Sequence, residues 1–172
     1  DECGTHRAMT PVYGRAPRGA RSVGQVPRNR GTGTTLVAAL TLAGMGPAMT
    51  IVGGTDAAVF EAYLEQGLAP TLRSGDLVIL DNVGAHQSRR ARALIEDRGA
   101  HLLFLPPYSP DLSPIELAFS KVKQVLRRSE ARTQAALDTA IGAALTTVTA
   151  ADARAWFAHC GYPLPAQPLR PP

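Results

Sequence analysis

The chain has few cysteines and few aromatic residues, and its charged residues are unevenly spread. Its 172 residues include only two cysteines, Cys3 and Cys160, which form neither a disulfide framework nor a metal-ligand spacing and indicate a reducing cytosol. The four histidines are scattered, with no pair at the helical spacing of a zinc site. Hydrophobic residues make up 45% and charged residues 19%, which favours one folded domain over a disordered chain.

Charged residues are missing altogether from residues 31–55, a stretch long enough to raise the question of a membrane span. The run "AGMGP" interrupts the stretch and threonines recur along it, which indicates two strands joined by a turn. No signal peptide is visible at the start of the sequence. We therefore expect a cytoplasmic protein without membrane contact.

Acids are missing from residues 7–30, which contain six arginines among glycines and prolines. The whole chain has a net charge of +4 and a pI of about 9.5, which permits a nucleic-acid partner without requiring one. The segment fits a solvated irregular loop, and it also fits a basic surface that faces phosphates.

The apolar patterns predict alternating strands and helices. Two strands are expected in "GTTLVAALTLAG" and "PAMTIVGG", joined at residues 44–47. A helix capped by Thr55 or Asp56 follows, and then "DLVILDN", "SRRARALIEDRG" and "AHLLFLPP" predict a βαβ unit with parallel strands and a helix ending at Gly99. Further helices are expected at residues 113–128, 133–148 and 150–159. This order predicts an α/β domain with a mixed sheet and flanking helices.

Two acids stand where an open α/β sheet would bind a ligand. Asp81 directly follows the strand run "LVIL", although Asp81 and Asn82 also suit a plain turn. Glu116 lies in the first turn of the helix that follows "LPPYSPDLSP". Because Ser113, Pro114 and Glu116 fit a capping box, the glutamate is either a cap or a ligand.

The helix that begins near Ser113 has two distinct faces. Its apolar stripe would pack on the sheet and consists of Ile115, Ala118, Phe119, Val122, Val125 and Leu126. Its second stripe consists of Glu116, Ser120, Lys123 and Arg127. That stripe suits a metal at one end with a phosphate backbone alongside, and the bases equally suit a solvated face that complements the helix dipole.

Three motifs together, "DE" at the start, "VILDNVGAH" and "LPPYSPDLSPIELAFSKVK", resemble the DDE transposases of the bacterial insertion-sequence branch related to mariner elements. The third motif is highly specific and the second moderately so. The 34 residues between Asp81 and Glu116 match the spacing of the family's second and third acids. The resemblance is clearest over residues 1–130, although Phe119 stands where many relatives carry tryptophan.

The resemblance implies an RNase H-like catalytic domain over residues 1–160. The composition of residues 161–172 predicts a proline-rich disordered tail. By the match, the catalytic and metal-binding acids are Asp1, Asp81 and Glu116. Secondary site residues are Glu2, Asn82 and His86, the last for phosphate contact or support of the site, or as an ordinary loop histidine. DNA contacts are expected from Arg15, Arg18, Lys121, Lys123 and Arg127. Because the chain opens with Asp1, we expect a fragment that lacks the strand leading into this acid and the helix-turn-helix modules of such enzymes.

The implied chemistry needs two Mg²⁺ ions, or Mn²⁺ in their place, held by the three carboxylates. Water would free a 3′-hydroxyl that then attacks target DNA, so the implied partners are element ends and target DNA in a bacterial nucleoid. The sequence leaves open whether the protein forms a homodimer. Prolines would stiffen the connection that positions Glu116. The alternative function is an inactive transposase remnant with at most non-specific DNA binding, and a different RNase H-like nuclease is the third.

Overall fold

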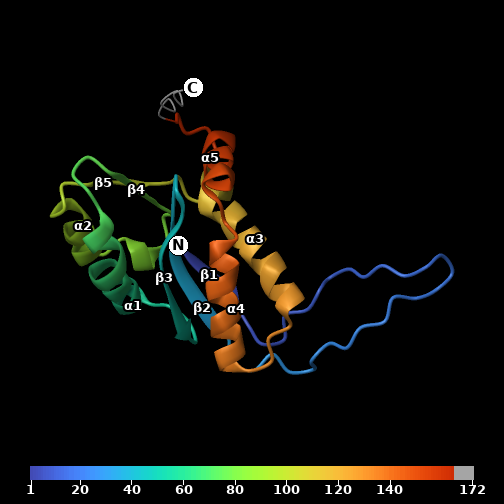
Figure 1. Cartoon of the computed structure of the whole chain (residues 1–172). Helices are drawn as coiled ribbons and strands as arrows, with labels where there is room; N and C mark the ends of the chain where they lie inside the picture. The colour runs from blue at the N-terminus through green and yellow to red at the C-terminus, as the bar shows by residue number, and fades with distance from the viewer. Residues whose placement is uncertain (165–172) are drawn as a thin grey trace.

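Two small sheets form the centre of the protein, which is described here by a computed structural model for residues 1–164 (Figure 1). The first sheet is antiparallel, with the order β1-β2-β3, and comprises β1 (Glu2–Thr5), β2 (Thr34–Thr41) and β3 (Gly44–Val52). The second is the parallel pair β4 (Leu77–Leu80) and β5 (His101–Phe104). The predicted α/β class and the parallel βαβ unit are confirmed, with the two kinds of pairing divided between two sheets.

Helices cover both sides of these sheets. On one side lie α1 (Ala57–Tyr63), which continues as π- and 3₁₀-turns to Thr71, and α2 (Arg89–Glu96). On the other lie α3 (Pro114–Ser129), α4 (Gln134–Thr146) and α5 (Ala150–His159), close to the predicted bounds. Short 3₁₀ turns cover Gly84–His86 and Pro110–Leu112. Of the two candidate caps for α1, Asp56 is the one whose side chain accepts from the Val59 amide.

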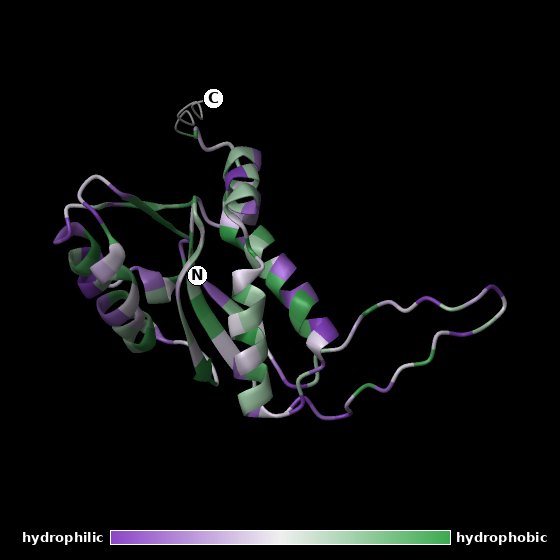
Figure 2. Cartoon of the chain, viewed as in Figure 1, coloured by the Kyte–Doolittle hydropathy of each residue, from purple (hydrophilic) through white to green (hydrophobic). Residues whose placement is uncertain are grey.

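The side-chain alternation of β2 divides the core in two. Leu36 and Ala38 pack with α3 and α4 against the fully buried Phe119, whereas Val37 packs with Phe60 and α1 on the opposite face. Full burial of side chains of this size contributes roughly 1.5–3 kcal/mol each. In Figure 2, hydrophobic residues colour parts of the strands between the helices, and hydrophilic residues are clearest on α1, α2 and α3.

The β2–β3 connection is shorter than the sequence suggested. Thr41 still pairs with Gly44, so the turn consists of residues 42–43, and the prediction of a joint at residues 44–47 is wrong. Gly44 is needed because its φ is +122° and a Cβ there would lie 2.9 Å from the Val148 carbonyl oxygen. Pro47 is tolerated because β3 is an edge strand, and its carbonyl accepts from the Tyr63 hydroxyl at 2.8 Å.

Residues 6–33 contain neither a helix nor a strand, and most of this segment projects from the body as a long exposed loop (Figure 1). At its base, the Arg132 guanidinium donates to the carbonyls of Arg7 at 3.2 Å and Met9 at 2.9 Å. The irregular conformation predicted for this arginine-rich segment is therefore confirmed.

The uncharged stretch at residues 31–55 forms β2 and β3. Across residues 1–164, no helix combines the length and apolar character that crossing a membrane would require. The disorder predicted for the proline-rich tail falls mostly on residues 165–172, which lie outside the described residues.

Candidate active site

Asp1 extends the ladder of the first sheet by one residue beyond β1. Its amino group donates to the Ala38 carbonyl at 3.1 Å, and the Ala38 amide donates to the Asp1 carbonyl at 3.0 Å. Cys3 packs in the core cluster that includes α3. Because side chains alternate along a strand, Asp1 lies on the same face as Cys3, toward α3, and Glu2 on the opposite face.

Glu2 and Asp81 are joined by a buried histidine. His86 has no exposed surface, and its Nδ1 lies 2.5 Å from Asp81 Oδ1 while its Nε2 lies 3.0 Å from Glu2 Oε2. The Phe60 ring packs against the imidazole with 4.1 Å between ring centroids. Burial raises the pKa of Glu2, but the hydrogen bond and charge of His86 outweigh it, so the net pKa is lowered. His86 thus links β1 to the end of β4, across the two sheets.

Glu116 lies in the first turn of α3 and is exposed. Of the two roles left open for Glu116, the capping box does not form: Ser113 is the N-cap residue, but its side chain makes no capping hydrogen bond, and the Glu116 amide donates to the Ser113 carbonyl at 3.2 Å. Within residues 1–164, the Glu116 carboxylate makes no hydrogen bond or ion pair. The helix start depends on Pro114, which supplies a preset φ and lacks an N–H to satisfy.

The acids of the predicted site gather around the first residue. Burial lowers the pKa of the Asp1 amino group, while the charges of Glu2, Asp81 and Glu116 raise it, so all three carboxylates lie within electrostatic range of this group. As placed in residues 1–164, no three Asp, Glu, His or Cys side chains form a group that could hold a metal ion. Carboxylate oxygens are nevertheless the donors that a hard divalent cation prefers.

Asn82 interacts with the side chain of Gln87. Its backbone and side-chain oxygens both accept from Gln87 Nε2, and it is exposed. The Val83 amide lies 3.4 Å from Asp81 Oδ1. Asp81 therefore has both of the roles considered for it: it opens the turn after β4, and it contacts His86.

The five predicted DNA contacts fall in different surroundings. Arg15 and Arg18 are exposed on the projecting loop. Arg127 lies near the base of that loop, where burial and the charges of Arg30 and Arg127 lower the pKa of His6. Lys121 pairs instead with Asp152 of α5, with 2.7 Å between Nζ and Oδ2.

Lys123 points toward the thiol of Cys3. Burial raises the pKa of that thiol, Lys123 opposes the rise, and Glu116 adds to it. Lys123 and Glu116 therefore lie near the same side of β1. Residue spacing on α3 predicted that the two would share a face, whereas nothing local in the sequence indicated the pairing of Lys121 with Asp152 or of Glu2 with His86.

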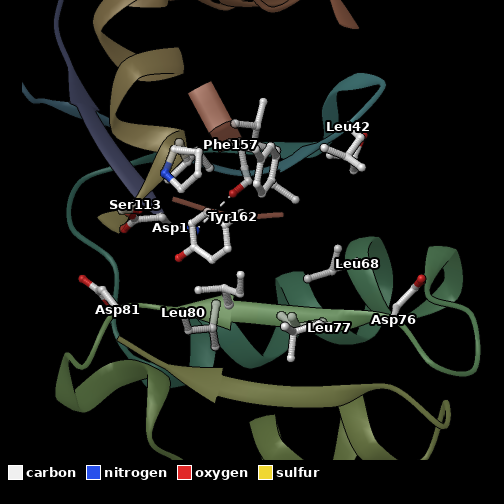
Figure 3. A pocket seen from close by; sticks show the side chains of 18 of the residues that line it. Asp1, Leu42, Leu68, Asp76, Leu77, Leu80, Asp81, Ser113, Phe157 and Tyr162 are labelled. Atoms are coloured by element: carbon white, nitrogen blue, oxygen red, sulfur yellow. Dashed lines mark hydrogen bonds between the residues drawn. The ribbon is translucent and has the colours of Figure 1, made fainter. Parts of the chain in front are cut away.

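A pocket of about 490 Å³ opens beside Asp1 between the two sheets (Figure 3). Asp1 and Asp81 both line it, with β2 on one side and β4 on the other. No sequence pattern indicates this pocket, because its walls come from segments far apart along the chain.

Comparison with known proteins identifies the fold. Residues 1–138 match the model of a family described as DDE superfamily endonuclease, whereas the curated proteins provide no match. A Mos1 transposase paired-end complex with the left transposon end matches 93% of this chain and 49% of its own, with a TM-score of 0.69 at 18% identity. A pre-cleavage Mos1 transpososome matches with a TM-score of 0.70 at 15% identity, over 92% of this chain and 50% of that chain.

The Mos1 mariner catalytic domain alone matches 75% of this chain and 68% of its own, with a TM-score of 0.58 at 16% identity. The chain thus spans about half the length of the longer Mos1 structures. These matches confirm the expected RNase H-like fold, which this chain shares with the Mos1 structures. With the family model covering most of its length, the chain belongs to the DDE superfamily endonuclease family.

Proposed function

We propose that this domain cuts DNA strands and joins the freed 3′ end to target DNA, as the catalytic part of a transposase. The supporting observation is that four acids from three elements, Asp1, Glu2, Asp81 and Glu116, gather at one end of the sheets. The family match supports this reading, as do the similar Mos1 structures, which include a paired-end complex with the left transposon end and a strand transfer complex.

Divalent cations fit this site by charge and by donor type. The carboxylates of Asp1, Asp81 and Glu116 would hold Mg²⁺ or Mn²⁺, and Mos1 complexes with each of these metals are among the similar structures. Such ions supply activation of the attacking oxygen and stabilisation of the leaving oxygen. Without cations the three carboxylates repel one another, so a bound cation would relieve unfavourable charge.

The other site residues have supporting roles in this proposal. His86 fixes the orientation of Asp81 and is itself held by Glu2. Glu116 is free to turn toward Asp1, since it takes no part in the helix cap. Asn82 shapes the turn after β4 through Gln87.

DNA would approach over the basic side of the molecule. His6, Arg30 and Arg127 lie close together at the base of the loop, and Arg15 and Arg18 extend the positive charge along it. Positive charge of this kind binds phosphates without reading sequence. The proposed substrates are element ends and target DNA, as encountered in a bacterial nucleoid.

A second function, an inactive remnant with at most non-specific DNA binding, is favoured by one observation. The acids in residues 1–164 are not placed as a ready ligand group for a metal ion. The two functions differ in whether DNA cleavage depends on these acids.

The deciding experiment is nicking of supercoiled plasmid in Mg²⁺ or Mn²⁺, with a chelator as the blank. We expect the unmodified chain to nick, and Glu116→Gln and Asp81→Asn to lower the rate at least ~100-fold. Asp111→Asn is the matched control, because it removes an exposed carboxylate from the connection before α3. Equal nicking by Glu116→Gln, or none by the unmodified chain, would support the remnant instead.

A further inference from the structure

The connection between β5 and α3, residues 105–113, leads the chain to Glu116. At its start the Leu105 amide donates to the Leu80 carbonyl at 2.8 Å. Beyond that point its backbone hydrogen bonds are local, such as the one from the Ser113 amide to the Pro110 carbonyl at 3.0 Å. Prolines limit the conformational freedom of such a segment, but they do not fasten it to the rest of the protein. Its position therefore depends on contacts from elsewhere in the fold.

Within residues 1–164, one hydrogen bond from a distant segment reaches residues 106–113. The Tyr162 hydroxyl donates to the Leu112 carbonyl at 2.7 Å, across 50 residues of sequence. No backbone amide of the described chain donates to this carbonyl. Leu112 is the last residue of the 3₁₀ turn, and α3 begins two residues later. The hydroxyl therefore fastens the connection immediately before the helix that carries Glu116.

The end of α5 directs Tyr162 toward this carbonyl. Gly161 has a φ of +86°, and its amide donates to the Ala158 carbonyl at 3.1 Å, while the Tyr162 amide donates to the Phe157 carbonyl at 3.0 Å. These two bonds and the left-handed glycine form a Schellman motif, which ends a helix and turns the chain. The Tyr162 ring packs edge-on against Phe157, with 5.7 Å between ring centroids. Both the ring and the hydroxyl of Tyr162 are thus held in place.

A second contact brings the end of α5 close to the connection. Burial and the charge of Asp111 raise the pKa of the Cys160 thiol, so these two residues lie near each other. Burial and Cys160 in turn raise the pKa of the Tyr162 hydroxyl, which therefore remains a donor at neutral pH. Ser113, Phe157 and Tyr162 line the same pocket, on the side that α3 and α5 form (Figure 3).

We propose that Tyr162 is a positioning residue, which holds the start of α3 and thereby sets where the Glu116 carboxylate lies. This inference rests on the proposed function, in which Glu116 meets Asp1 and Asp81 around a divalent cation. Such a site requires its ligands to be held within about 0.5 Å of their working positions. Because the Glu116 carboxylate makes no hydrogen bond of its own in the part of the chain that the structure describes, its placement depends on the helix backbone.

The family match does not assign this role. Tyr162 lies beyond residues 1–138, over which the chain matches the DDE superfamily endonuclease model. The residue acts on Glu116 only through the connection and the helix start, and it does not itself bind the cation. Its loss should therefore weaken the grip on the metal more than it lowers the rate at saturating metal.

The test compares two variants that each lose one tyrosine hydroxyl. Tyr162→Phe removes the bond to the connection and keeps the ring beside Phe157. Tyr63→Phe is the matched control, because its hydroxyl donates to the Pro47 carbonyl in β3 at 2.8 Å, away from the connection. Since the two variants lose the same kind of hydrogen bond, a general loss of stability would affect both alike.

Two kinds of measurement separate these variants. Without metal or DNA, amide exchange at Ser113 and Glu116 should quicken by about 3- to 10-fold in Tyr162→Phe, as expected for the loss of one hydrogen bond. Mn²⁺ binding, followed by the paramagnetic resonance of the free ion, should weaken by about 3- to 10-fold. Plasmid nicking should need correspondingly more Mn²⁺, while its maximum rate stays within about twofold. Tyr63→Phe should change none of these quantities.

Unchanged exchange in Tyr162→Phe, faster exchange with unchanged Mn²⁺ binding, or equal effects in Tyr63→Phe would each overturn the proposal. If the unmodified chain binds Mn²⁺ but does not nick, weaker binding by Tyr162→Phe supports the positioning role, and only the proposed function fails. Nicking with the same Mn²⁺ requirement in both variants overturns the positioning role and leaves the proposed function standing. A chain that neither binds Mn²⁺ nor nicks overturns both.

Discussion

At the scale of single residues, His86 holds the two halves of the site together. Within residues 1–164 it is the largest polar side chain without exposed surface, and it contacts the carboxylates of Glu2 in β1 and Asp81 after β4. Buried polar groups are costly unless satisfied, and here both ring nitrogens have partners. The histidine therefore contributes to stability as well as to the placement of Asp81.

Replacing this histidine should destabilise the domain measurably. We expect His86→Ala to lower the free energy of unfolding by about 2–4 kcal/mol, because it leaves a cavity beside Phe60 and two carboxylates without a partner. Glu2→Gln keeps an acceptor for the ring and should cost only about 1 kcal/mol. Urea unfolding measures both. A loss below about 0.5 kcal/mol for His86→Ala would contradict the structural role.

At the scale of elements, one carboxylate fastens α5 to α3. Asp152 completes a capping box with Thr149, whose hydroxyl accepts from the Asp152 amide, and it also pairs with Lys121 of α3 at 2.7 Å. The hydrogen bonds from Lys121 and Thr149 hold the pKa of Asp152 well below its usual range. A lowered pKa means that the folded state favours the ionised carboxylate.

This link should make stability depend on pH in the acid range. The contribution of Asp152 is present above the pKa of the unfolded chain, near 4, and is lost as the pH falls toward the lower pKa of the folded state. We expect Asp152→Asn to lower the thermal midpoint at pH 7, with the difference from the unmodified chain shrinking between about pH 4 and 2. Asp138→Asn, on α4, is the control. If the difference in thermal midpoint between Asp152→Asn and the unmodified chain did not change with pH, the charge of Asp152 would not be the source of the stabilisation.

Local patterns predicted most of the elements, and the failures have non-local causes. The joint at residues 44–47 was wrong because Gly and Pro usually mark turns, and only the pairing of β2 with β3 makes Pro47 an edge residue. The capping-box alternative for Glu116 does not form, although the residue types at Ser113 and Glu116 would allow it. Helix α3 was predicted well, because its apolar stripe repeats over four turns.

The site was predicted in part for similar reasons. The spacing of Asp81 and Glu116 comes from the motifs, and strand alternation explains why Asp1 and Glu2 take different faces. The contact between Glu2 and His86 spans 84 residues, and it depends on how the turn after β4 lies against β1. Lys121 looked like a DNA contact because its partner, Asp152, lies 31 residues away.

At the scale of the whole molecule, the projecting loop carries arginines without acids, whereas arginines of α2 pair with Glu65 and Glu96. The projecting loop and the C-terminal end of α3 lie together, whereas α2 lies on the opposite side of the sheets (Figure 1). The loop residues Arg15 and Arg18 are exposed and, within residues 1–164, make no ion pair. Their charge is available for phosphates, in contrast to that of Lys121.

Removing these charges should weaken DNA binding in a salt-dependent way. We expect the double variant Arg15→Ala, Arg18→Ala to reduce the slope of log K against log salt by about 2, equally for different DNA sequences. Fluorescence anisotropy with labelled duplexes over a salt series measures this. Arg98→Ala is the control, since this exposed base follows α2. If the slope were unchanged in the double variant, the DNA phosphates would have to contact a different part of the protein surface.

The projecting loop also has a consequence for how the domain responds to trypsin. Five arginines between residues 15 and 30 are open to cleavage, so a nick would separate the peptide carrying Asp1 from the rest of the polypeptide. That short peptide would remain attached through the four residue pairs of β1 with β2 and through buried Cys3 and Met9. The first acid of the candidate site thus belongs to a piece that can be cut free covalently and still be retained by the fold.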